Sequence, residues 1–229
     1  MMTDSCTVLR LGLVDYLEAW ELQKRLAREV GEGRSGGWLL LLEHPPTYTL
    51  GVRAREEHLL LARESLGRLG AKVHRADRGG DVTYHGPGQL VGYPILNLKC
   101  WGTGPLWYVR TLESALIDAL AALGVEAGRV EGRTGVWVGN EKIAAIGVHV
   151  SRGVTTHGFA LNVDPDLAYF RHIVPCGLAD ASVTSVRRVL ERPVSMEQAA
   201  DAVVCAFASR FGLSMVEADP GRVLAGAPS

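Results

Sequence analysis

Cys176 is the residue whose setting in this sequence most favours covalent chemistry. It stands between Pro175 and Gly177 in the segment IVPCGLADASVTS (173–185). The proline fixes the incoming backbone, and the glycine leaves room for a ligand to approach. Two interpretations stay open. Cys176 is a nucleophile exposed on a turn, or it is an inert thiol packed under a loop, as most single cysteines are.

A nucleophilic cysteine needs a neighbouring cation or base, because its unperturbed pKa is about 8.5. The candidates for that partner are Lys142, His85, His157 and His172. Lys142 opens the strand pattern KIAAIGVHV, and strict alternation places it on the same face as Ala144, Ile146, Val148 and Val150. A lysine on an apolar face is unusual. The alternative is that Lys142 sits at a hairpin turn and reaches water.

Small residues gather on one face of two predicted strands. The face of the KIAAIGVHV strand opposite to Ile146 carries Ala145 and Gly147. In THGFALN (156–162), Gly158 and Ala160 share a face in the same way. Such faces leave space for an elongated apolar substrate, and they also suit tight packing of a sheet against a helix.

The stretch ADRGGDVTYHGPGQLVGYP (76–94) is the densest in unusual residues, with five glycines, an arginine and a histidine. Gly79 and Gly80 let backbone N–H groups turn inward and bind an oxyanion or a carbonyl oxygen. The stretch fits neither the phosphate-loop nor the dinucleotide-binding pattern. A glycine-rich hairpin loop with a structural His85 is the alternative.

The elements that must position these residues follow from periodicity and from helix caps. Most are strands, and the helices come in separate blocks, which favours the α+β class: a mixed sheet with packed helices, in one domain over residues 7–212, followed by a C-terminal tail at 213–229. Thr47–Val52 is expected to continue the second strand at an edge. The predicted helices are 15–33, 56–70, 105–124 and 195–212, with Asp15 and Ser195 as N-caps. The predicted strands are 7–12, 37–44, 72–77, 81–86, 89–98 and 155–163, with a hairpin at 133–153.

Composition excludes several classes of function. The 229 residues carry a net charge of −1, so no general nucleic-acid or membrane surface is expected. The longest apolar runs, such as WLLLL (38–42), are far shorter than the roughly 20 residues of a membrane span. The N-terminus lacks the pattern of a signal peptide, and the four cysteines lack zinc spacing. We therefore expect a cytoplasmic protein without metal or cofactor.

Taken together, these motifs identify a resemblance that covers most of residues 7–190. The chain resembles the bacterial octanoyltransferases, or lipoyl(octanoyl) transferases. The matching pieces are LLLEHPPTYTLG (40–51), RGGDVTYHGPGQLVGYP (78–94), GRTGVWV (132–138), KIAAIGVHVSRGVTTHGFALNV (142–163) and IVPCGL (173–178).

The resemblance implies the fold of the catalytic domain shared by biotin and lipoate protein ligases. It implies transfer of an octanoyl group from octanoyl-acyl carrier protein to a lysine of a lipoyl domain, the first step of endogenous protein lipoylation. The acceptors would be the lipoyl domains of 2-oxoacid dehydrogenase complexes and the glycine cleavage H protein. It implies Cys176 as the acyl-thioester nucleophile and Lys142 as its activating partner. The substrate-binding residues that it implies are Arg78, Gly79, Gly80, Asp81, Val82, Thr83, Tyr84, His85, Ala145, Ile146, Gly147, His157, Gly158, Phe159 and Ala160.

Three other functions stay open at this point. A lipoate or octanoate protein ligase on the same fold would activate a free acid with ATP and needs no cysteine nucleophile. An octanoyl amidotransferase would move the group between two lipoyl-domain proteins. A domain that only docks carrier proteins would leave Cys176 and Lys142 without a role. The cysteine in PCG favours transfer over ligation.

Overall fold

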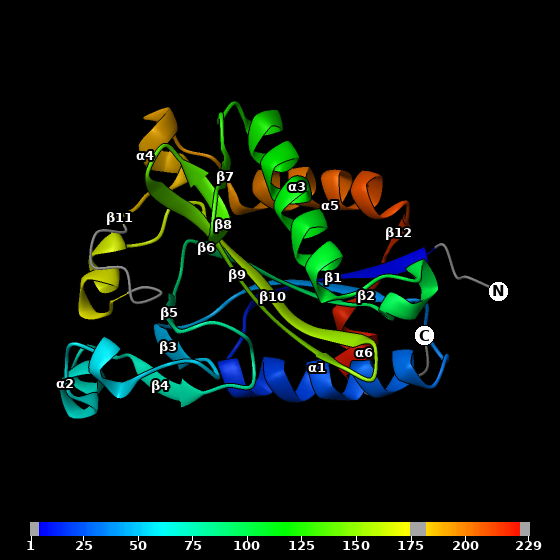
Figure 1. Ribbon diagram of the computed structural model, residues 1–229, viewed down its shortest axis with the longest axis horizontal. Coiled ribbons are helices and arrows are strands. Elements are labelled where there is room, and N and C mark those ends of the chain that lie inside the picture. The colour runs from blue at the N-terminus through cyan, green and yellow to red at the C-terminus, as the bar shows by residue number, and fades with distance from the viewer. Residues whose placement is uncertain (1–4, 175–181, 225–229) are drawn as a thin grey trace.

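The computed structural model describes residues 5–174 and 182–224, which form two β-sheets with helices packed on them (Figure 1). The larger sheet is mixed, and its strand order is β12-β1-β2-β6-β10-β9-β8-β7, with β11 also paired to β9. Its strands are β1 (Ser5–Leu13), β2 (Trp38–Glu43), β6 (Gln89–Ile95), β7 (Gly128–Val130), β8 (Arg133–Val138), β9 (Glu141–Ser151), β10 (Val154–Asn162), β11 (Ser182–Val183) and β12 (Ser214–Glu217). The smaller sheet has the order β4-β3-β5, with β3 (Thr47–Leu50), β4 (Lys72–Arg75) and β5 (Val82–His85).

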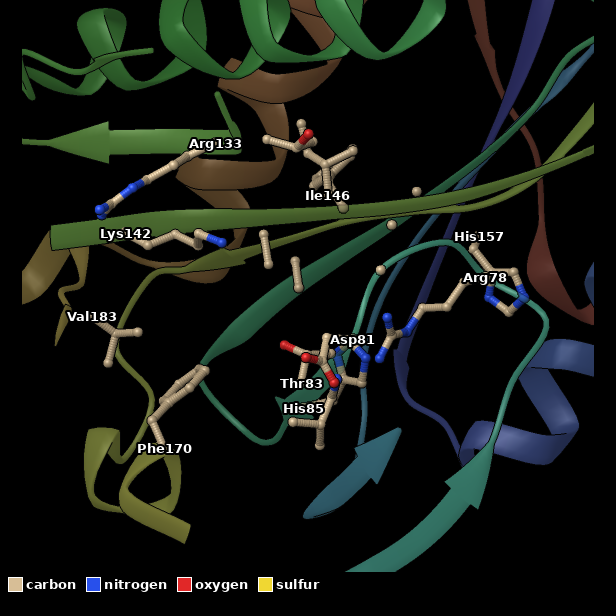
Figure 2. A pocket seen from close by; sticks show the side chains of 18 of the residues that line it. Arg78, Asp81, Thr83, His85, Arg133, Lys142, Ile146, His157, Phe170 and Val183 are labelled. Atoms are coloured by element: carbon tan, nitrogen blue, oxygen red, sulfur yellow. The ribbon is translucent and has the colours of Figure 1, made fainter. Parts of the chain in front are cut away.

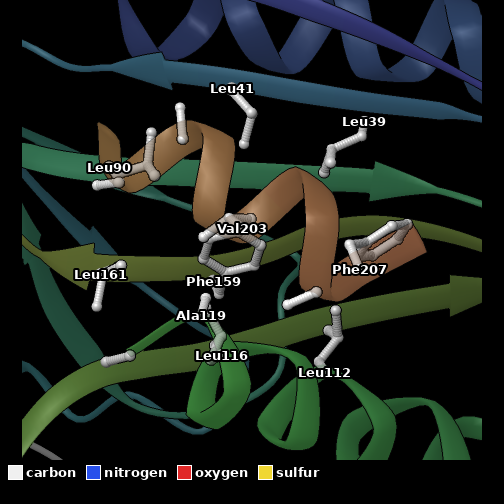
Figure 3. Packing of buried hydrophobic residues seen from close by; sticks show 14 of the residues in the cluster. Leu39, Leu41, Leu90, Leu112, Leu116, Ala119, Phe159, Leu161, Val203 and Phe207 are labelled. Carbon is white, nitrogen blue, oxygen red and sulfur yellow. The ribbon is translucent and has the colours of Figure 1, made fainter. Parts of the chain in front are cut away.

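Helices cover both faces of the larger sheet. The helices α3 (Pro105–Leu123) and α5 (Met196–Phe211) pack on one face, and α1 (Tyr16–Gly31) packs on the other (Figure 1). The continuous apolar run of β2 follows from this arrangement, because a strand buried on both faces has no polar side. Leu39 and Leu41 join the core under α3 and α5 (Figure 3), whereas Leu40 and Leu42 face α1.

The N-caps predicted at Asp15 and Ser195 are confirmed, as is the end of the helix predicted at 105–124. Asp15 accepts a hydrogen bond from the Leu17 N–H at 2.9 Å and begins α1. Ser195 and Gln198 form a reciprocal capping box at the start of α5. Gly124 ends α3 in the left-handed conformation, which glycine adopts without strain. The hairpin of β8 and β9 is also confirmed.

One predicted helix is wrong. Residues 56–70 form a short 3₁₀ turn, η1 (Glu56–His58), and a helix of one and a half turns, α2 (Arg63–Arg68). Between these two elements, the backbone of Leu59 and Leu60 pairs with residues 172 and 173. Leu59 forms a β-bridge with Ile173, and the Leu60 N–H donates to the His172 carbonyl oxygen at 2.8 Å. Pairing with a segment far away in the sequence therefore interrupts the helix.

One strand assignment also needs correction. Thr47–Leu50 is the central strand of the smaller sheet and not an edge continuation of β2. The strands predicted at 81–86 and 89–98 are confirmed as β5 and β6, and they lie in different sheets, β5 in the smaller one and β6 in the larger one. This stretch therefore crosses from one sheet to the other.

The remaining helical elements are short. They are η2 (Leu98–Trp101), η3 (Leu167–His172), α4 (Val186–Leu190) and α6 (Pro220–Leu224). Where the sequence predicts a tail after residue 212, β12 pairs in parallel with β1, with Ser5 opposite Ser214. In the described parts of the chain, no helix combines the length and the apolar character that a membrane crossing requires. The predicted α+β fold with a mixed sheet is confirmed.

Candidate active site

A cavity of about 790 Å³ lies between the face of the larger sheet at β9 and β10 and the smaller sheet (Figure 2). Fourteen of the sixteen predicted site residues within the described ranges line it. They are Arg78, Gly80, Asp81, Val82, Thr83, His85, Lys142, Ala145, Ile146, Gly147, His157, Gly158, Phe159 and Ala160. The two sheets therefore bring together residues from three separate sequence motifs.

The other two predicted residues, Gly79 and Tyr84, contact residues around the cavity without lining it. The Gly79 N–H donates to the Val148 carbonyl oxygen at 2.8 Å, which attaches the glycine-rich loop to β9. Tyr84 is buried and stacks on Tyr169, with ring centroids 4.8 Å apart. Neither lies on the surface of the cavity.

Small residues of β9 and β10 lie directly opposite each other on the cavity wall. Gly147 pairs with Gly158, and Ala145 pairs with Ala160. A Cβ on Gly158 would lie 2.2 Å from the Gly92 carbonyl oxygen, and one on Gly147 would lie 2.9 Å from the Gly79 carbonyl oxygen. The neighbouring backbone can approach these two glycines closely because they have no side chain. All four residues are small, so this wall of the cavity is flat.

Lys142 extends from the start of β9 toward this wall (Figure 2). It lines the cavity and is only 8 % exposed. Its Nζ lies 4.8 Å from the centroid of the Trp137 ring, a cation–π distance. A buried lysine whose ammonium group lies over an aromatic ring is held in one place, which suits a group that acts on a bound substrate.

The strict alternation predicted for β9 is wrong at Lys142, because a β-bulge interrupts the pairing with β8. Val136 lies opposite Ala144, but the next residue, Trp137, lies opposite Lys142, so β9 carries one extra residue, Ile143. Ile143 and Ala144 are both buried in the core under α3 and α5. The bulge therefore turns Lys142 away from the core and into the cavity.

Arg78 is fixed by the smaller sheet. Its guanidinium donates to Thr49 through Nε at 3.1 Å and Nη2 at 2.9 Å to the hydroxyl, and through Nη2 at 2.5 Å to the carbonyl oxygen. Nη1 donates to the Gly79 carbonyl oxygen at 3.0 Å. This side chain is 7 % exposed, so a nearly buried positive charge borders the cavity at a fixed position.

His157 has an unusual backbone conformation within β10, with φ of +56°. Its N–H donates to the Gln23 side chain of α1 at 2.7 Å, and its Nε2 lies 2.7 Å from a carboxylate oxygen of Asp77. Burial lowers the pKa of His157, which favours the neutral imidazole. The hydrogen bond from His157 lowers the pKa of Asp77. A neutral histidine donating to a carboxylate explains both directions.

Cys176 lies outside the described residues, but both segments that flank it are described. Before it, the Val174 N–H donates to the His58 carbonyl oxygen at 2.8 Å. After it, β11 pairs in parallel with β9, so that Val183 lies opposite Lys142. Val183 itself lines the cavity. The described residues on both sides of the Cys176 segment are therefore attached to residues that line the cavity, His58 and Lys142.

Several cavity residues were not predicted from the sequence. They are Tyr16, Arg53, Arg55, His58, Gln89, Tyr93, Glu131, Gly132, Arg133, Thr134, Trp137, Asn162, Phe170 and Val183. Some had a signal, because Gln89 belongs to the densest stretch and Trp137 to the matching piece GRTGVWV. Tyr16, at the first turn of α1, had none, because only the packing of that helix brings it to the cavity.

Comparisons with known proteins agree with this fold. The chain matches the family model "Lipoyl protein ligase A/B catalytic domain" over residues 15–208. A putative lipoate protein ligase from T. acidophilum with bound lipoic acid superposes with a TM-score of 0.76 at 18 % identity, over 93 % of this chain and 88 % of that one. A lipoate-protein ligase A bound with ATP gives 0.77 at 16 % identity, over 97 % and 92 %. These likenesses define the class of fold.

Curated relatives narrow the class further. An octanoyltransferase of Chloroflexus aggregans is 51 % identical over 215 residues, which cover 93 % of this chain and 97 % of the relative. An octanoyltransferase of Solibacter usitatus is 50 % identical over 97 % of this chain and 99 % of the relative. The chain belongs to the octanoyltransferase family, and it is an acyl-transferring enzyme of that type.

Proposed function

We propose that the chain transfers an octanoyl group from octanoyl-acyl carrier protein, through an acyl thioester on Cys176, to a lysine of a lipoyl domain. The acceptors are the lipoyl domains of 2-oxoacid dehydrogenase complexes and the glycine cleavage H protein. The proposal keeps the cytoplasmic location that the sequence predicts. Support comes from octanoyltransferase relatives at about half identity over almost the whole chain.

One observation carries the assignment of roles. Lys142 lines the cavity, and the strand that follows the Cys176 segment pairs with Lys142 itself. On the other side, Cys176 is only two residues from Val174, which is bonded to His58. A cation near a thiol favours the thiolate.

In the first half-reaction, the Cys176 thiolate attacks the carbonyl carbon of the octanoyl thioester and gives a tetrahedral oxyanion. The oxyanion collapses, the bond to the carrier sulfur breaks, and octanoyl-Cys176 forms. The protonated amine of Lys142 gives its proton to the departing thiolate and becomes neutral. The acyl chain lies along the flat wall of Ala145, Gly147, Gly158 and Ala160.

In the second half-reaction, the neutral amine of the acceptor lysine attacks the carbonyl carbon of octanoyl-Cys176. Lys142 takes the proton that the new amide nitrogen releases, and the Cys176 thiolate leaves. The thiolate and the protonated Lys142 are thereby restored, so the cycle closes without a net change in the enzyme. The cavity residues of the glycine-rich loop, from Arg78 to His85, hold the substrate in this scheme.

The proposal is tested by the intact mass of the protein after mixing with octanoyl-acyl carrier protein. Wild type is expected to gain one octanoyl group, which a lipoyl domain then removes, and Cys176→Ala is expected to gain none. Cys100→Ala serves as the matched control, because Cys100 is an exposed free thiol and does not line the cavity. Acylation of the lipoyl domain that appears only with ATP and free octanoate would identify a ligase instead. Transfer from an octanoylated lipoyl domain, and not from the carrier protein, would identify an amidotransferase.

A further inference from the structure

Along the cavity, a continuous series of hydrogen bonds joins Arg78 to Lys142. It begins at Arg78, which donates from Nε and Nη2 to the Thr49 hydroxyl at 3.1 and 2.9 Å. The Thr49 oxygen lies 3.4 Å from His85 Nε2, and His85 Nδ1 lies 3.0 Å from Gln89 Oε1. The series thus reaches β6 from the smaller sheet.

The amides of Gln89 and Asn162 complete the series. Gln89 Nε2 donates to Asn162 Oδ1 at 2.9 Å and to the Tyr84 carbonyl oxygen at 3.2 Å. Asn162 Nδ2 donates to the Thr184 carbonyl oxygen at 3.0 Å. The Thr184 N–H then donates to the Lys142 carbonyl oxygen at 3.0 Å. Three strands of the larger sheet are connected in this way.

The direction of every bond in the series is determined. The nitrogen of the Gln89 amide is engaged as a donor twice, so its oxygen must face His85, and the proton of the imidazole is on Nδ1. His85 Nε2 is then an acceptor for the Thr49 hydroxyl proton. All donors consequently point from Arg78 toward Lys142, an arrangement in which neighbouring bonds polarise and strengthen one another.

The series is buried throughout, so water does not replace its members. Thr49, Gln89, Asn162 and Thr184 are at most 3 % exposed. The pairing of β11 with β9 extends over only two residues on each strand. So short a pairing is weak by itself. The bond from Asn162 to the Thr184 carbonyl oxygen supports it directly beside Lys142.

We propose that Gln89 and Asn162 are positioning residues for Lys142. Both border the cavity, but their amide groups are engaged by protein partners. They hold Val183 and Thr184 against β9 and so fix the backbone from which the Lys142 side chain enters the cavity. The inference rests on the proposed catalytic role of Lys142.

The test compares Asn162→Leu and Gln89→Met, which keep the approximate shape of each side chain and remove its hydrogen bonds. The matched control is Thr155→Val, because Thr155 is also a fully buried polar residue of β10, bonded to Pro94 and Leu96, and does not line the cavity. Steady-state kinetics of octanoyl transfer and the melting temperature are measured for each. The two test variants are expected to lose about 100-fold in kcat, the effect of misplacing a catalytic group by about 1 Å, with KM for the octanoyl donor little changed. Thr155→Val is expected to lower the melting temperature similarly and to keep kcat.

A second measurement identifies the route of the effect. Asn162→Leu is added to Lys142→Ala, and no further loss of kcat is expected if Asn162 acts through Lys142. Fully additive losses, or a kcat of Asn162→Leu equal to that of Thr155→Val, would overturn the inference and leave the proposed function intact. Unchanged kcat in Lys142→Ala would overturn the proposed function itself. If Asn162→Leu does not fold, Gln89→Asn, which shortens the amide by one methylene, is carried through the same comparison.

Discussion

The Trp137 ring and the Lys142 ammonium face each other at 4.8 Å across the bulge between β8 and β9. Trp137 is only 2 % exposed, so this contact is largely shielded from water. A desolvated cation–π contact contributes about 2 kcal/mol. The bulge that turns Lys142 into the cavity therefore also brings its ammonium group to an aromatic ring that stabilises the positive charge.

Replacing Trp137 by leucine is expected to reduce the rate of octanoyl transfer about 30-fold, which corresponds to the loss of about 2 kcal/mol. Trp137→Phe keeps an aromatic face and is expected to retain most of the rate. Single-turnover kinetics of both variants, with melting temperatures recorded beside them, check this. Equal rates for the two variants would show that the ring serves only as packing.

Gly158→Ala is expected to destabilise the fold strongly, because its Cβ would lie 2.2 Å from the Gly92 carbonyl oxygen. Overpacking of this kind costs about 1–3 kcal/mol, and contact with backbone leaves little room for relaxation. Gly128→Ala in β7 is the matched control, because nothing lies within 4 Å of its added Cβ. Urea denaturation measures both. A loss for Gly158→Ala no larger than for Gly128→Ala would contradict the close packing of β6 and β10.

The carboxylate of Glu113, in α3, is fully buried and connects this helix to the hairpin of β8 and β9. It accepts hydrogen bonds from Arg110 and Arg129 at 2.8 Å and from the Gly135 N–H at 3.1 Å. Glu113→Leu leaves these donors without their acceptor, and a loss of about 3 kcal/mol in the free energy of unfolding is expected. Glu32→Gln, at an exposed ion pair with Arg34, is the control and is expected to change stability by less than about 1 kcal/mol. Similar small losses in both variants would show that Glu113 does not hold the hairpin.

The stability of the protein is expected to fall as the pH is lowered from 7 toward 4. Burial lowers the pKa of His44 to about 4, and the unfolded value is about 6.5. Between these values the unfolded chain binds a proton that the folded chain does not, so acid favours unfolding by roughly 3 kcal/mol at the lower end. The tautomer agrees, since His44 Nδ1 donates to the Val14 carbonyl oxygen at 2.6 Å and Nε2 accepts from the Tyr93 hydroxyl at 2.8 Å.

Urea denaturation at several pH values measures this dependence for wild type and for His44→Gln. The variant is less stable at pH 7, because its buried contacts are imperfect, but its stability should change less between pH 7 and 4. Burial also lowers the pKa of His85 and His157, so some dependence on pH is expected to persist in the variant. Parallel curves for the two proteins would exclude His44 as a source of the acid sensitivity.

Much of the fold could be predicted because its signals are local. Asp15, Ser195 and Gly124 satisfy backbone groups within their own helix ends, and the apolar run of β2 records burial on both faces. The candidate site residues also have local signals, since Arg78, Lys142 and Gly158 belong to short recognisable motifs. Fourteen residues of those motifs line one cavity.

The rest depends on contacts between distant parts of the chain. The bulge at Ile143 exists because β8 and β9 pair with a shifted register, and no local pattern in KIAAIGVHV encodes that shift. The helix predicted at 56–70 is interrupted because Leu59 and Leu60 pair with residues more than a hundred positions away. The assignment of β5 and β6 to different sheets likewise depends on their partner strands, which cannot be read from the sequence of β5 and β6 alone.

The parallel pairing of β1 with β12 has a consequence for synthesis of the chain. β1 is synthesised before β12, yet Ser214–Glu217, more than two hundred residues later, cover one of its two edges. Until the ribosome has released those residues, an apolar strand with free N–H and C=O groups is open to pairing with another chain. β12 therefore completes this edge of the sheet. A nascent chain that stops before β12 is expected to bind chaperones.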